Sequence, residues 1–276
     1  MSVVNGVMGP LFDWILYPFR SVHPLIGLTI VSAVCAVLML LGFRATSDQE
    51  GLAAVKRKIA AGIFEIRLYN DDILAILRAQ AALLRHNLTY MRLNVVPMLW
   101  MIVPFVLVVA QLQFHYGYRG LQPGDSTTLR VTLAESAVPA SGAPEVDLDV
   151  PEGLRVDSPS VWIPSEREIA WRLVVEDGGV HELGVALGGD TWSKRVVASE
   201  QVLRRSPWRL QAGFLDQLLY PAESPLPADA PVAQIAVDYP DREVGLWGWD
   251  GHWLIAFLIL TIGLAYALKG FFGVTI

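Results

Sequence analysis

The stretch His23–Phe43, HPLIGLTIVSAVCAVLMLLGF, decides the fold class of this 276-residue chain. It contains no Asp, Glu, Lys or Arg, and it is as long as a helix must be to cross the ~30 Å hydrocarbon core of a bilayer. Two further charge-free runs of similar length follow, Val95–Phe114 and His252–Leu268. Together with a mean hydropathy of +0.43, the three runs predict an integral membrane protein with three transmembrane helices.

The charged residues between these runs predict how the chain is oriented. Residues 44–94 hold eight Lys or Arg against five acids, whereas residues 117–250 hold eleven against twenty-one, a net charge of −10. Short basic loops stay in the cytoplasm, whereas large acidic domains can be translocated. We therefore expect the N-terminus and residues 116–250 outside, and the hairpin and C-terminus inside. With one cysteine, Cys35, and no exported glycosylation sequon, a prokaryotic inner membrane is the expected location.

The predicted segments cover the whole chain. Residues 1–22 lack the basic start of a cleaved signal peptide and predict a short amphipathic helix in the outer interface, ending near Pro18. A frayed hydrophobic leader is the alternative. Trp247, Trp249 and Trp253 predict an aromatic belt at the outer end of the third run. In order, the segments are 1–22 (interfacial), 23–43 (first span), 44–94 (cytoplasmic hairpin), 95–115 (second span), 116–250 (outer domain), 251–268 (third span) and 269–276 (cytoplasmic tail).

Residues 44–94 predict two antiparallel amphipathic helices. Ser47 and Glu50 have the spacing of a capping box, and Tyr69–Asp72 predicts the turn, with Asn70 or Asp71 capping the second helix. Apolar residues recur every three or four positions in both helices, which predicts one buried stripe on each. The stripes are Leu52, Val55, Ile59, Ile63 and Ile66 in the first helix, and Ile73, Ile76, Leu77, Leu84, Leu88 and Met91 in the second.

Lys56, Arg57 and Lys58 form the most basic run of the hairpin. Clustered cations beside a membrane bind anionic lipid headgroups or nucleic-acid phosphates. The run is therefore a candidate contact for the ribosome, for a client protein or for lipid, and the fixing of topology is the plainer alternative.

Residues 116–250 predict an all-β domain. Gly188-Gly189-Asp190 predicts a tight hairpin turn, and turn-forming clusters recur about every ten residues. This pattern favours an antiparallel β-sandwich with immunoglobulin-like topology. Leu210–Leu219 predicts a short amphipathic helix. The alternating segments are Thr128–Leu133, Val146–Val150, Trp171–Val175, Leu183–Leu187, Trp192–Val197 and Ala233–Tyr239.

No residue pattern points to covalent chemistry. The sequence lacks Cys/His pairs with metal-ligand spacing, a His-Glu-x-x-His motif, a Gly-x-Ser-x-Gly elbow and a Gly-rich phosphate loop. Asp147 and Asp149 alternate along one strand, which is too few ligands for calcium. We therefore predict no enzyme activity, no catalytic residue, no cofactor, no metal site and no DNA partner.

The order of segments resembles the YidC/Oxa/Alb membrane-protein insertase superfamily. The resemblance rests on the interfacial stretch Pro10–Pro18, on the basic-apolar start of the hairpin at Val55–Ile59, and on the second span entered through Asn94-Val-Val-Pro97-Met. Three spans are similar to the reduced branch of archaeal YidC-like proteins and the corresponding ER membrane complex subunit. The resemblance covers roughly residues 10–114 plus the third run, and the large outer domain departs from it.

The resemblance implies a non-covalent insertase or intramembrane chaperone with nascent membrane proteins and the ribosome as partners. Bacterial members place an arginine mid-membrane, whereas here Ser32–Val37 is uncharged and the nearest arginine is Arg44. Polar groups for a client groove are Thr29, Ser32, Asn94 and Gln111, and helix–helix hydrogen bonds are the alternative role for them. The second functional hypothesis is a membrane-anchored scaffold or signalling protein whose outer β-domain binds a partner.

Overall fold

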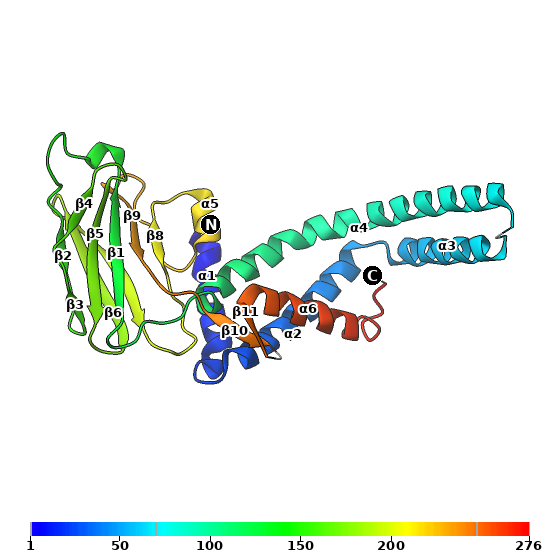
Figure 1. Cartoon of the computed structure of the whole chain (residues 1–276), viewed down its shortest axis with the longest axis horizontal. Coiled ribbons are helices and arrows are strands. Elements are labelled where there is room, and N and C mark those ends of the chain that lie inside the picture. Colours follow the sequence, from blue (N-terminus) through cyan, green and yellow to red (C-terminus); the bar gives the residue numbers. More distant parts are fainter. Residues whose placement is uncertain (1, 70, 247, 276) are drawn as a thin grey trace. The chain divides into compact units, whose positions relative to one another are not determined.

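The computed structural model describes residues 2–69, 71–246 and 248–275. The chain folds into two compact units. The outer unit, as we name it, consists of Met1–Gly27 and Leu107–Ala256, and the hairpin unit consists of Leu28–Val106 and Phe257–Ile276. Three helices, α2, α4 and α6, contribute residues to both units (Figure 1).

Two helices of the described chain are long and apolar enough to cross a membrane. They are α2 (Pro24–Thr46) and α4 (Ile73–Tyr116). The third predicted span is α6 (Trp253–Leu268), which is apolar throughout but has only 16 residues. The predicted start of this span at residue 251 is replaced by strand β11 (Trp249–His252).

Helix α4 joins the second hairpin helix and the second predicted span in one helix of 44 residues. We expected a boundary at residues 94/95, but the helix continues through it. Pro97 and Pro104 lie inside α4, and each removes one backbone hydrogen bond. Apolar side chains around them continue the helical pattern on both sides, so the two missing bonds do not end the helix.

The hairpin consists of α3 (Gln49–Leu68) and the first half of α4. Asp48, rather than Ser47, caps α3 by accepting from the Gly51 N–H, because Ser47 instead donates to Phe43 O at the end of α2. Asp72 caps α4 by accepting from Leu74 and Ala75. The predicted cap Asn70 lies outside the described residues, and Asp71 is exposed in the turn.

The predicted stripe of α3 is buried only at its start, at Leu52 and Val55, whereas Ile63 is exposed. The predicted stripe of α4 is largely on the wrong face. Leu77, Leu84 and Leu88 are 55%, 64% and 60% exposed, and Ala79 is buried instead. The face toward α3 begins at Ile76 and continues through five residues that do not belong to the predicted stripe. They are Ala79, Leu83, His86, Tyr90 and Leu93. The α4 residues Ile73 and Met91 are exposed as well.

The outer unit contains two antiparallel sheets that share one core. The larger has the order β3-β5-β1-β9-β8, with β4 also paired to β5, and the smaller has the order β2-β6-β7. Leu129, Leu173, Val185 and Val196 come from both sheets and are fully buried in one cluster. The strands are β1 (Ser126–Leu133), β2 (Asp147–Asp149), β3 (Leu154–Val156), β4 (Val161–Ile163), β5 (Glu168–Val175), β6 (Gly179–Leu187), β7 (Asp190–Ala198), β8 (Trp208–Leu210) and β9 (Val232–Val237).

The predicted strands and the hairpin turn are confirmed, but the immunoglobulin-like order is not. Strand β1 lies inside its sheet between β5 and β9, whereas the first strand of the immunoglobulin order lies at an edge. Gly188 and Gly189 have φ of +65° and +96°, and they turn β6 back into β7 as a two-residue loop requires.

Three short elements complete the outer unit. Helix α1 (Ser2–Leu16) is longer than predicted and contains Pro10. Helix α5 (Phe214–Leu219) occupies the end of the predicted Leu210–Leu219 helix, whose first residue belongs to β8. Strands β10 (Glu243–Leu246) and β11 form a separate ribbon before α6. Trp253 is buried and donates from Nε1 to Gln113 Oε1 over 2.9 Å, so it is not part of a surface belt. Trp247 and the Trp249 side chain lie outside the described part.

Candidate functional site

The four predicted groove residues are divided between the two units. Gln111 belongs to the outer unit, and Thr29, Ser32 and Asn94 to the hairpin unit. The Asn94 side chain donates to Tyr90 O on its own helix over 2.8 Å. Thr29 is half-buried. Ser32 and Gln111 are buried, and neither Ser32 Oγ nor Gln111 Oε1 meets a hydrogen-bond partner among the described residues.

Thr261 is a buried polar residue of α6 that we did not predict. Like Ser32, its hydroxyl has no hydrogen-bond partner in the described part of the chain. Ser32 and Thr261 each lie eight residues after the start of their helix, which corresponds to a depth of about 12 Å at 1.5 Å per residue. A buried hydroxyl without a partner costs about 1–3 kcal/mol. Each of the two apolar helices thus holds one buried hydroxyl without a partner among the described residues.

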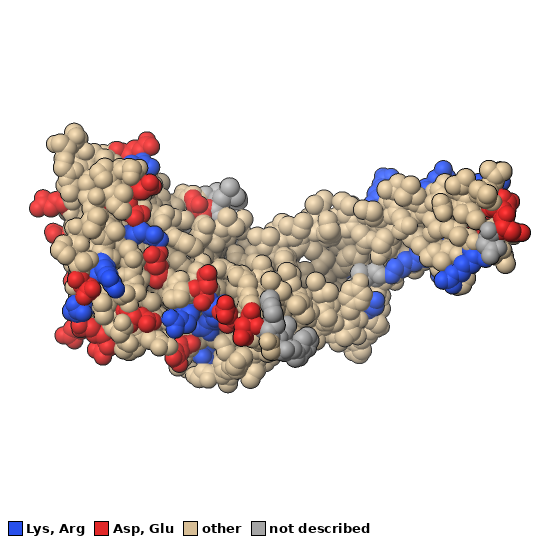
Figure 2. Space-filling view, viewed as in Figure 1, with Lys and Arg blue, Asp and Glu red and all other residues tan. Residues whose placement is uncertain are grey.

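Lys56, Arg57 and Lys58 lie on the hairpin as predicted and are exposed. Lys56 Nζ lies 5.9 Å from the centre of the Tyr90 ring, so this lysine also links α3 to α4. Figure 2 shows further Lys and Arg side chains on both helices of the hairpin and acidic side chains at its turn. The hairpin therefore presents positive charge along its sides, suited to phosphate or to acidic protein segments.

The outer unit contains a charged contact between α1, α4 and the β-domain that we did not predict. Asp13 on α1 is 2.9 Å from His115 Nε2 and 3.1 Å from Arg204 Nη2. The other nitrogen of His115, Nδ1, is 2.9 Å from Gln111 O. Both ring nitrogens thus face acceptor oxygens, and both hydrogen bonds form only when each nitrogen carries a hydrogen.

Helix α1 approaches the β-domain closely at the same place. A Cβ at Gly9 would lie 2.1 Å from Arg204 Nη1, so a larger residue there would displace the end of the Arg204 side chain. Asn5 donates to the carbonyl oxygen of Gln217 on α5. Phe12 and Leu16 are buried, whereas Val7, Leu11 and Trp14 on the other face are 44–75% exposed. Helix α1 therefore has one buried and one exposed apolar face, and its place in a membrane interface stays a prediction.

Replacing Asp13 by asparagine is expected to loosen α1. Burial raises the pKa of Asp13, but the hydrogen bond from His115 and the charge of Arg204 outweigh it and hold this pKa below its ordinary value. The ionised group therefore adds stability above pH ~4, and this is lost as the pH falls through the lowered pKa. At pH 7 we expect amide hydrogen exchange in α1 to accelerate about tenfold in the variant, equivalent to ~1.4 kcal/mol.

The matched control for Asp13→Asn is Asp238→Asn. Asp238 pairs with Arg130 at the exposed surface of the β-domain, where an ion pair contributes little. Its replacement should leave exchange in α1 unchanged. Equal exchange in wild type and Asp13→Asn would show that Asp13 does not hold α1.

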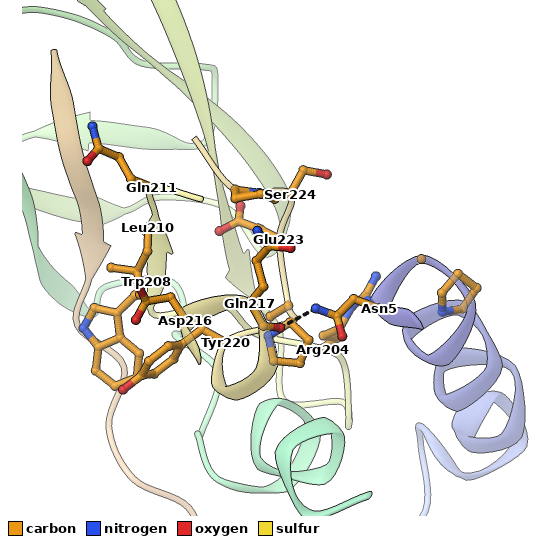
Figure 3. Close-up of a pocket in the computed structure, with 15 residues that line it drawn as sticks. Asn5, Arg204, Trp208, Leu210, Gln211, Asp216, Gln217, Tyr220, Glu223 and Ser224 are labelled. Atoms are coloured by element: carbon orange, nitrogen blue, oxygen red, sulfur yellow. Dashed lines mark hydrogen bonds between the residues drawn. The ribbon is translucent and has the colours of Figure 1, made fainter. Parts of the chain in front are cut away.

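A cavity of about 230 Å³ lies beside this contact, between α1, α5 and β8. Figure 3 shows Asn5 of α1 facing Gln217 of α5, with Trp208, Asp216 and Tyr220 on the other side. The Trp208 and Tyr220 rings meet edge to face at 5.3 Å. The described residues contain no group of three His, Cys, Asp or Glu placed to hold a metal. The cavity is lined by both polar and aromatic side chains.

Two cations are buried inside the β-domain. Lys194 is completely buried and pairs with Glu223, which also accepts from the Arg195 N–H. Arg205, equally buried, donates to the carbonyl oxygens of Ser199 and Gln201 over 2.6 Å each. Arg205 lies outside the strands, where no alternation indicates burial. Lys194 alternates in phase with the buried Trp192 and Val196 of β7, so its burial was predictable from the strand pattern.

No protein-family model matches this chain, and no curated protein matches its sequence.

Proposed function

We propose that this chain is a membrane-protein insertase or intramembrane chaperone of the YidC/Oxa type, with three membrane-crossing helices and no covalent chemistry. The topology is supported by the segments that belong to the outer unit. Asp13 precedes α2, His115 ends α4, and the two are in contact. Because the two helices between them can each cross a membrane, the N-terminus and the β-domain share one side, and the hairpin lies on the other.

Contacts at both ends of α6 support a third crossing. Its first residue, Trp253, bonds to Gln113 near the end of α4. After its last turn, Phe272 O accepts from Arg44 Nη1 over 3.0 Å, and the Thr275 N–H donates to Gln49 Oε1 over 2.7 Å. The basic hairpin and the acidic β-domain then agree with an inward hairpin.

The shortness of α6 supports a role in lowering the barrier to insertion. Sixteen residues span about 24 Å, less than the ~30 Å of an average hydrocarbon core. A short span is accommodated by local thinning of the bilayer. A client helix moving its polar flank through a thinner region crosses less hydrocarbon.

The observation that carries the proposal is the pair of buried hydroxyls, Ser32 and Thr261, at matching depth in two apolar helices. Polar groups inside a membrane usually face protein or water and mark a path. Because both hydroxyls are buried, an arriving client segment would reach them only where the helices separate, and it would then supply the hydrogen bonds that both lack. The basic hairpin would then receive the ribosome or the cytoplasmic part of the client.

Photocrosslinking in cells tests this function. A photoreactive residue replaces Ser32, Val106 or Ile63 in turn, and Val34, which is 53% exposed on another face of α2, is the control. We expect Ser32 and Val106 to capture many different newly made membrane proteins and Val34 to capture few. Capture of one constant protein, with nothing newly synthesised, would contradict the proposal.

The cavity of Figure 3 favours a second function, a membrane-anchored scaffold whose outer domain binds a partner. A photoreactive residue at Gln217, which lines the cavity, discriminates between the two. A scaffold predicts one partner at Gln217 and no newly made protein at Ser32, whereas an insertase predicts varied proteins at Ser32.

A further inference from the structure

Helix α4 carries two apolar seams on opposite faces, and the hairpin uses only one of them. The used seam faces α3. Leu83 lies within 3.1 Å of the Cβ position of Gly62, and Tyr90 lies under Lys56. Ile76, Ala79, Leu83, His86, Tyr90 and Leu93, which are 3 or 4 residues apart, line it and are at least half-buried.

The second seam follows a heptad repeat without interruption. Its residues are again 3 or 4 apart, which is the pattern of the a and d positions of a coiled coil. The a positions are Leu74, Ala81, Leu88, Val95 and Ile102, and the d positions are Leu77, Leu84, Met91 and Met98. All nine are exposed, and the eight large side chains among them are 44–64% exposed.

Lipid does not account for the whole of this seam. Its last part, Val95–Ile102, lies in the predicted second span, where lipid would cover it. Its first part, Leu74–Met91, lies in the hairpin among exposed arginines. Helix α4 continues from one part to the other as a single helix, so the hairpin leaves the span without the sharp bend needed to lie flat on a membrane (Figure 1).

We propose that this bare seam of α4 pairs with the same seam of a second copy of the chain, as a parallel coiled coil. The residues beside the seam favour this partner. The e positions are Arg78, Arg85 and Arg92, and the g positions are Gln80, Asn87 and Asn94. In a parallel pair each g position faces the next e position of the partner helix, so that Gln80 and Asn87 face arginines.

The same residues disfavour the antiparallel arrangement. There the e positions face each other, and arginine would oppose arginine along the interface. Two copies inserted into one membrane with the same topology already present their α4 helices in parallel. The dimer does not depend on whether the chain inserts clients.

Disulfide crosslinking in native membranes tests the dimer. Cys35 is the only cysteine. A Cys35→Ala chain therefore receives one new cysteine, either at Leu84, which is a d position, or at Leu88, which is an a position. The control is Ala82→Cys, which is also exposed but lies on another face of α4. We expect mild oxidation to convert Leu84→Cys and Leu88→Cys to a species of twice the chain mass, with a dimer-to-monomer ratio about tenfold above the control.

Two outcomes overturn the proposal. Equal crosslinking at Leu84, Leu88 and Ala82 would indicate random collision, and a product of any other mass at Leu84 would indicate a different partner.

A second measurement tests the geometry of the dimer. Adding Leu77→Glu and Met91→Glu to the Leu84→Cys chain should abolish its dimer, because four carboxylates would meet in the interface. A mass of one chain for the wild type in mild detergent, together with absent crosslinks, would also refute the dimer.

Discussion

Replacing Arg205 by methionine is expected to lower the midpoint of thermal unfolding of the outer unit by about 10 °C, the equivalent of ~4 kcal/mol. The guanidinium of Arg205 donates to four backbone carbonyls, those of Tyr118, Ser199, Gln201 and Leu203. It is buried, and burial lowers its pKa to about 10, so it remains charged at neutral pH. Methionine fills a similar volume but leaves the four carbonyls without a donor, at about 1–3 kcal/mol for a buried polar group.

The unfolding of Arg205→Met is measured on the purified full-length protein in detergent, followed by tryptophan fluorescence. Arg130→Met is the matched control. Arg130 pairs with Asp238 at the surface and is 38% exposed, so its loss should change the midpoint by no more than a few degrees. Arg205→Lys retains the charge but not the planar fork and should fall between the two. An unchanged midpoint for Arg205→Met would show that the four carbonyls find other donors.

Glu223→Gln is expected to destabilise the outer unit by about 3–5 kcal/mol at pH 7, because it leaves a buried charge without a counter-ion. Lys194 has no exposed surface, and its Nζ bonds only to Glu223 and to Ser206 O among the described residues. Burial lowers the pKa of Lys194, and Glu223 opposes that shift. Without Glu223 this pKa should fall further.

The sign of the pH dependence in Glu223→Gln follows from this lowered pKa. Above the pKa of Lys194 in the folded state, the unfolded chain binds more protons than the folded one, so stability rises with pH up to the ordinary lysine value of ~10.4. The deficit of Glu223→Gln relative to wild type should therefore shrink between pH 7 and pH 9. Urea unfolding at both values measures it.

A double variant distinguishes the cost of the unpaired Lys194 charge from the loss of the Lys194–Glu223 interaction. Lys194→Met combined with Glu223→Gln removes both charges and should recover most of the stability that Glu223→Gln loses, as replaced buried ion pairs commonly do. Additive losses in the double variant, or a deficit that is independent of pH, would contradict the role assigned to the Lys194 charge.

The sequence predicted the elements whose patterns are local. Three such patterns extend over no more than about twenty residues each. They are the length of the apolar run in α2, the alternation in β1 and β5, and the Gly188-Gly189 turn. The caps were misplaced by one residue or more, because Ser47, Asp48 and Asn70–Asp72 all have side chains that can cap a helix. Only their geometry selects Asp48 and Asp72.

Long-range choices were not predictable in the same way. Helix α4 has apolar residues on two faces, and counting large side chains favoured the face that is exposed. Ala79 and Gly62 permit the close approach of α3 on the other face, and small residues contribute little to a hydropathy count. The strand order depends on pairings between segments that are far apart in the chain. The contact of Asp13 with Arg204 leaves no trace in either local sequence.

The contact between Asp13 and Arg204 can form only late in biosynthesis. Arg204 is synthesised 191 residues after Asp13. At about 5–20 residues per second, α1 waits roughly 10–40 s for its partner. During this interval the face with Phe12 and Leu16, which is buried in the finished protein, is without the contact between Asp13 and Arg204. A lipid surface that holds α1 from the start would shield this face from aggregation and keep the helix formed until the β-domain arrives.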